Sequence, residues 1–152
     1  MSDKLSQSGT SHTVAVLQIK GLSKQYGTKK VADNLNLTIN RGEFFTFLGS
    51  SGSGKSTTLR MVAGLETPDS GTITISGKDM AGVPPWKRNV GMVFQQYAVF
   101  PHMSVAENVA YGLRVRGMSV ADRNRRVDAL LEMVSLSGYG ERRVTSLSGG
   151  EQ

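Results

Sequence analysis

One short stretch of the sequence combines glycines, a lysine and hydroxyl side chains at a spacing that suits phosphate binding. Residues 49–56 read GSSGSGKS and fit the pattern G-x-x-x-x-G-K-[ST]. Glycines allow positive φ angles and let a phosphate approach the backbone N–H groups. Lys55 would place a positive charge against the β- and γ-phosphates, and the Ser56 hydroxyl could ligate Mg²⁺. The stretch predicts a polyphosphate site that comprises Gly49, Ser50, Ser51, Gly52, Ser53, Gly54, Lys55, Ser56 and Thr57.

A loop of this kind needs a strand before it and a helix after it. Residues 44–48 are apolar apart from one threonine and predict a buried strand that ends at Gly49. Residues 57–65 contain helix-forming side chains, and the dipole of a helix that begins near Gly54 would favour the phosphates. The alternative is a flexible glycine/serine linker that contains Lys55 by chance, which the flanking segments disfavour.

The remaining pattern predicts a strand-rich part followed by a helical part, with the boundary near Gln95. Apolar alternation or apolar runs predict strands at 14–19, 35–40, 72–75 and 90–94. The pair Ser104 and Glu107 has the spacing of a capping box and predicts a helix start. Ser119 and Asp122 open a second helix in the same way. Its apolar face comprises Val127, Leu130, Leu131 and Val134, and we expect Ser137-Gly138 to end it.

Composition narrows the function further. The 152 residues, 38% of them hydrophobic, suffice for one domain or part of one. The sequence has no cysteine, which excludes disulfides, thiolate metal sites and a cysteine nucleophile. It has no apolar run long enough to span a membrane, and residues 1–12 are polar and predict a loose leader. The net charge of +6 suggests nucleic acid, but the basic residues are dispersed, so we expect no nucleic-acid partner.

Three further motifs follow the order of a known family. Residues 24–27 read KQYG, residues 93–95 read VFQ and residues 147–152 read LSGGEQ. Together with the phosphate loop, they resemble the A-loop, Q-loop and signature motif of the ATP-binding subunit of an ABC transporter. Glu151 stands where the family usually has glutamine. The resemblance covers nearly the whole chain.

This resemblance implies an α/β fold of the P-loop NTPase class, the ABC-type nucleotide-binding domain. Residues 13–152 would form it. Residues 13–95 would supply an antiparallel β subdomain and a partial RecA-like core with the A-loop, Walker A and Q-loop, and residues 96–152 a helical subdomain. Tyr26 would stack on adenine, and Gln95 would meet Mg²⁺ or the attacking water. Residues from a second subunit would complete the site of a head-to-tail homodimer, namely Ser148, Gly149, Gly150 and Glu151.

The resemblance also implies partners. Residues 97–105 would contact a transmembrane permease subunit at the cytoplasmic face of the plasma (inner) membrane, and an extracytoplasmic solute-binding protein would act indirectly. Residues 84–88, 90–95, 97–103 and 107–109 resemble importer ATPases for polyamines (spermidine/putrescine), ferric iron, sulfate or maltose-type sugars. We favour polyamine, although no residue here would touch the cargo.

The sequence also departs from the family. It has no apolar strand that ends in Asp-Glu, so the family's Mg²⁺-binding aspartate and general-base glutamate are absent from these 152 residues, and Glu132 and Glu141 are poor substitutes. We therefore expect a C-terminally truncated domain in which Lys55 and Gln95 are the remaining catalytic residues and hydrolysis is very weak. Two alternatives stay open: a nucleotide-binding remnant without turnover, and an ABC-type ATPase that acts on nucleic acid.

Overall fold

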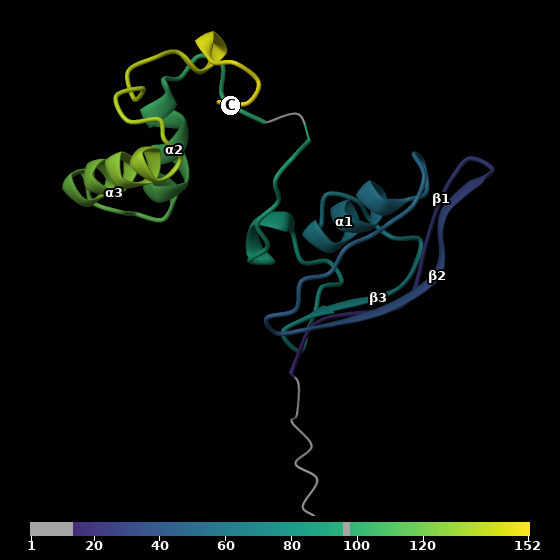
Figure 1. Cartoon of the computed structure of the whole chain (residues 1–152). Coiled ribbons are helices and arrows are strands. Elements are labelled where there is room, and N and C mark those ends of the chain that lie inside the picture. Colours follow the sequence, from purple (N-terminus) through teal and green to yellow (C-terminus); the bar gives the residue numbers. More distant parts are fainter. Residues whose placement is uncertain (1–13, 96–97) are drawn as a thin grey trace, which may run out of the picture. The chain divides into compact units, whose positions relative to one another are not determined.

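The computed structural model describes residues 14–95 and 98–152, which form two compact units (Figure 1). The expected leader and residues 96 and 97 lie outside the described residues. The first unit is Met1–Met92 and the second is Val93–Gln152. No helix in the described ranges is long and apolar enough to cross a membrane.

An antiparallel sheet and one helix build the first unit. The strands are β1 (Ala15–Tyr26), β2 (Lys29–Asn40), β3 (Ser70–Ile75) and β4 (Lys78–Asp79), in the spatial order β2-β1-β3-β4. Helix α1 (Lys55–Ala63) lies beside the sheet (Figure 1), and its Met61 is buried with Ile19, Leu22, Ile73 and Met80. The strands predicted at 14–19, 35–40 and 72–75 are confirmed, and the helix predicted at 57–65 forms as α1, with both ends two residues earlier.

The hairpin of β1 and β2 matters most for the site. Tyr26 pairs with Lys29 at its tip, so the last residue of β1 and the first residue of β2 lie next to each other. Gly27 has a φ of 57° in the turn between them. Directly opposed residues of an antiparallel pair have Cα atoms about 4.5–5.5 Å apart. The backbone of the tip therefore places Tyr26 and Lys29 opposite each other.

The second unit is helical. It contains α2 (Val105–Val115), α3 (Val120–Met133) and the short 3₁₀ helix η2 (Val144–Ser146). The capping box is confirmed: the Glu107 N–H donates to Ser104 Oγ at 3.2 Å, and the Ser104 N–H donates to Glu107 Oε2 at 2.7 Å. Its buried core comprises Val105, Val127, Leu131, Val144 and Leu147.

The predicted end of the second helix is wrong by several residues. Helix α3 ends at Met133, and Ser135 already has a φ of 61°, so the chain turns before Ser137. Val134 consequently leaves the apolar face and is 60% exposed. The predicted start is confirmed, because Ser119 Oγ accepts a hydrogen bond from the Asp122 N–H.

The buried strand predicted at 44–48 and the strand predicted at 90–94 do not form. Neither segment belongs to a strand, and Phe44 is 95% exposed, Leu48 90% and Val93 98%. A buried strand needs hydrogen-bonding neighbours and covered faces. No strand of the described ranges pairs with either segment, so their apolar side chains are not buried in a sheet.

Candidate nucleotide-binding site

The phosphate loop joins the exposed segment 44–48 to the N-terminus of α1. Gly54 is the N-cap of α1 and has a φ of 87°, in the left-handed region that favours glycine. A Cβ atom on Gly54 would lie 1.8 Å from the carbonyl oxygen of Val31 on β2. Only glycine therefore lets the loop pack this closely against β2.

Lys55 lies over the loop. Its Nζ donates to the carbonyl oxygens of Gly49 at 2.8 Å and Ser50 at 2.7 Å, and to Ser53 Oγ at 3.2 Å. Thr58 is buried and its Oγ1 donates to the Gly54 carbonyl oxygen at 3.0 Å, which fastens the start of α1. The ammonium group is thus held where a phosphate would meet the loop.

A hollow of about 160 Å³ lies over this loop. Its lining comprises Lys29, Val31, Gly52, Ser53, Gly54, Lys55, Ser56 and Thr57. The first turn of α1 has no acidic residue, so its N-terminal dipole and the two lysines make the hollow favourable for an anion. Ser56 adds a hard oxygen donor beside Lys55, which suits Mg²⁺.

Tyr26 lies in the same unit and is 47% exposed. The Lys24 Nζ is 5.3 Å from the centroid of the Tyr26 ring. The same ammonium group forms ion pairs with Glu66 at 3.0 Å and Asp69 at 3.2 Å. A hydrogen bond to Glu66 raises the pKa of the Tyr26 phenol. These contacts orient the ring while almost half of its surface stays accessible to a base.

The other predicted site residues belong to the second unit. Gln95 is exposed and lies in a segment without regular structure. In the signature motif, the backbone N–H and the hydroxyl of Ser148 both donate to Glu151 Oε2, at 2.8 and 2.6 Å. The hydrogen bond from the Ser148 hydroxyl lowers the pKa of the Glu151 carboxyl. Gly149 and Gly150 are exposed in the turn. Within the first unit, the contacts of Tyr26 are with Lys24, Glu66 and its ladder partner Lys29, and Lys29 lines the hollow over the phosphate loop.

Hydrogen bonds connect residues 98–105 to α2. These residues are the described part of the expected permease contact. The Phe100 N–H donates to Asn108 Oδ1 at 2.8 Å, and Asn108 Nδ2 donates to the Phe100 carbonyl oxygen at 3.1 Å. The rings of Phe100 and Tyr111 are 4.5 Å apart. The contact of Asn108 with Phe100 could not be predicted, because an asparagine on a helix carries no local signal for it.

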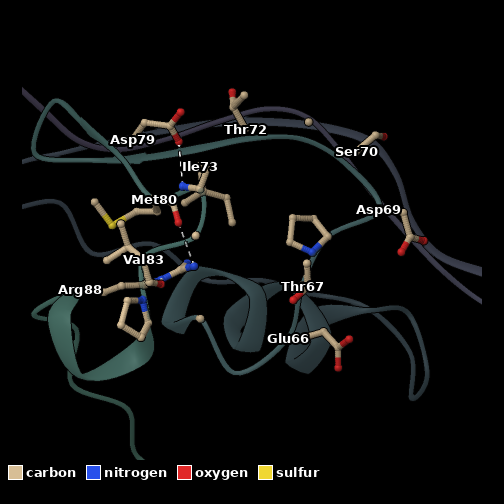
Figure 2. A pocket seen from close by; sticks show the side chains of 16 residues that line it. Glu66, Thr67, Asp69, Ser70, Thr72, Ile73, Asp79, Met80, Val83 and Arg88 are labelled. Carbon is tan, nitrogen blue, oxygen red and sulfur yellow. Dashed lines mark hydrogen bonds between the residues drawn. The ribbon is translucent and has the colours of Figure 1, made fainter.

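A second hollow, of about 460 Å³, shares no residue with the phosphate loop (Figure 2). It lies between the end of α1 and the strands β3 and β4, and Arg88 lines it. Two of its carboxylates, Glu66 and Asp69, already pair with Lys24. Sequence reasoning also missed Arg88 and Lys29, whose contacts join segments that are distant along the chain.

Comparison with known proteins identifies the family. The sequence model of a family described as ABC transporter matches residues 32–152. The chain belongs to the ABC transporter family. A solved structure titled as the dimeric, post-hydrolysis state of the ATP-binding cassette MJ0796 bound to ADP and Pi superposes with a TM-score of 0.79 at 30% identity. The match covers 89% of this chain and 64% of that one, which confirms the expected fold class.

Curated relatives of this ABC family member are longer. The chain is 49% identical over 140 residues to the spermidine/putrescine import ATP-binding protein PotA of Pseudomonas aeruginosa (strain UCBPP-PA14), covering 92% of the chain and 39% of the relative. It is 50% identical over 137 residues to PotA of Methylococcus capsulatus, covering 90% and 36%. The chain thus spans less than two fifths of the length of these relatives.

Proposed function

We propose that this chain binds MgATP through residues 49–57 and belongs to the ATP-binding subunit of an ABC importer. The observation that supports this most is the phosphate loop itself, in which Gly54 packs against β2 and the Lys55 ammonium lies on the loop carbonyls. Tyr26 would stack on adenine, a contact that contributes about 1–3 kcal/mol in other base–aromatic pairs. Ser56 and Gln95 would ligate Mg²⁺.

Titration of the 152-residue chain with a fluorescent ATP analogue tests this proposal. Lys55→Ala should weaken binding at least tenfold, because it removes the charge that the loop holds for the phosphates. Tyr26→Ala should weaken binding, whereas Tyr26→Phe, which keeps the ring, should bind like the wild type. Chelation of Mg²⁺ should reduce affinity. Unchanged affinity in Lys55→Ala would contradict the assignment of the loop.

Hydrolysis separates the main proposal from its alternative. An importer ATPase should release phosphate, and typical enzymes turn over at about 1–10³ per second. We expect very weak turnover by this chain alone, because the sequence supplies no general-base glutamate after an apolar strand. ATP binding without any phosphate release would favour the nucleotide-binding remnant. Retention on DNA that weakens steeply with salt would instead favour a nucleic-acid ATPase.

The cargo and partners are further proposals. The printed names of the relatives are those of spermidine/putrescine import proteins, so we propose a polyamine importer. The solved relative is titled as a dimer, which supports a homodimer in which residues 148–151 close over the ATP of the partner. Residues 97–105 would contact a permease at the cytoplasmic face of the inner membrane. Uptake of labelled spermidine, with sulfate and maltose as competitors, tests the cargo.

A further inference from the structure

Lys29 reaches the phosphate loop from the hairpin tip. It is the first residue of β2 and pairs with Tyr26 in the ladder. Its Nζ lies 3.4 Å from the position that a Cβ on Gly52 would take. Because Gly52 has no side chain, the ammonium can approach the loop backbone closely. Lys29 and Lys55 consequently line the same hollow.

We propose that Lys29 is a second phosphate-binding cation of this site, in addition to Lys55. This assignment rests on the proposed nucleotide function. Two ammonium groups on one small hollow repel each other, and an anion between them removes that repulsion. The polyphosphate chain of a nucleotide carries enough negative charge to satisfy both. Lys29 is also the ladder partner of Tyr26, so it comes from the same hairpin tip as the residue proposed to stack on the base, and it lines the hollow that Lys55 lines.

Comparison with the neighbouring Lys30 shows that the position of Lys29, and not only its charge, places it at the phosphate loop. Lys30 pairs with the two carboxylate oxygens of Asp33 at 3.2 and 3.1 Å. Successive side chains of a strand point to opposite faces, which separates the two lysines. Within residues 14–95 and 98–152, Lys29 has no ion pair with a carboxylate. Its charge therefore stays available to a ligand.

The test compares Lys29→Gln with Lys30→Gln in the 152-residue chain, with ATP and adenosine as ligands. Lys29→Gln should bind ATP about three- to tenfold more weakly, the range expected for a charged contact that stays partly solvated. Its affinity for adenosine should not change, because adenosine has no phosphate. Lys30→Gln should match the wild type for both ligands. Lys29→Arg should keep ATP affinity, since it keeps the charge.

Salt provides an independent readout. The affinity of the wild type for ATP should fall with rising ionic strength more steeply than that of Lys29→Gln, because one screened charge–charge interaction is missing in the variant. Both lysine variants should retain the wild-type circular dichroism spectrum, since both side chains are exposed. Equal ATP affinity in Lys29→Gln and wild type, or an equal loss for adenosine, would overturn the proposal. If the wild type binds no ATP at all, the proposed function fails first, and this assignment fails with it.

Discussion

Arg88→Met should destabilise the first unit. The Arg88 guanidinium donates to four backbone carbonyl oxygens: those of Val83 at 2.8 Å, Met61 at 2.9 Å, Val62 at 3.1 Å and Met80 at 3.0 Å. Figure 2 shows Arg88 beside Met80 and Val83. Two of these carbonyls belong to the last turn of α1, which has unpaired carbonyl groups and a negative dipole end. Arg88 thus ties the helix that follows the phosphate loop to the chain after β4.

The magnitude follows from which carbonyls keep another partner. A hydrogen bond to a charged group contributes about 1.5–3 kcal/mol net. The Met61 oxygen also accepts from the Gly64 N–H, and the Met80 oxygen also accepts from the Val83 N–H. Loss of Arg88 therefore leaves these two carbonyls with a hydrogen-bond partner and costs less free energy there. Burial lowers the pKa of Arg88, a sign that desolvation offsets part of the gain. Counting chiefly the other two bonds, we expect Arg88→Met to lower the free energy of unfolding by about 3 kcal/mol.

Urea unfolding followed by far-ultraviolet circular dichroism measures this loss. Lys87→Met is the matched control, because Lys87 is adjacent and exposed and loses the same charge. Arg88→Lys should recover only part of the stability, since one ammonium group lacks the planar fork that reaches several carbonyls. Amide hydrogen exchange at Gly64 and Leu65, at the end of α1, should accelerate in Arg88→Met. If Arg88→Met and Lys87→Met unfold at the same urea concentration, the reasoning is refuted.

Two further substitutions probe the phosphate loop and the ion pair between Asp69 and Lys24. Gly54→Ala should weaken ATP binding more than tenfold, because the new Cβ would displace Val31 or the loop. The left-handed backbone alone should cost about 1–2 kcal/mol of stability. Nucleotide titration measures the first effect and thermal unfolding the second. The Gln25 N–H and the Lys24 ammonium hold the pKa of Asp69 below its ordinary value of 3.8, so its contribution is present above the unfolded-state pKa and is lost as pH falls through the folded-state pKa. Thermal unfolding between pH 7 and pH 3 should therefore show a shallower loss of stability in Asp69→Asn than in the wild type, and equal slopes would exclude this role.

Features that depend on neighbours along the chain could be predicted from the sequence. The caps at Ser104 and Ser119 need only a side chain and a backbone N–H three residues later, and both form. Apolar alternation placed β1, β2 and β3 because each strand turns one face to the core. The residues of the phosphate loop were recognised because the backbone requirements of phosphate binding restrict the residue types directly.

Contacts between distant segments could not be predicted in this way. Lys29 and Lys30 are chemically identical, and only the pairing of Tyr26 with Lys29 decides which ammonium reaches Gly52. Arg88 likewise meets the carbonyls of α1 across 26 and 27 residues of sequence. Nothing in the local pattern of either residue differs from that of an ordinary surface cation.

The failure of the strand predicted at 44–48 clarifies what supports the phosphate loop. An apolar segment favours burial, but a strand also needs a neighbouring strand for its backbone hydrogen bonds. The apolar pattern of residues 44–48 does not indicate which strand that would be. The loop nevertheless keeps its contacts: Gly54 packs on β2, Lys55 bonds the loop carbonyls, and Thr58 fastens α1. Its geometry therefore depends on β2 and α1 rather than on a strand before it. The candidate second cation, Lys29, likewise comes from β2. The strand–loop–helix pattern of the sequence does not include that strand.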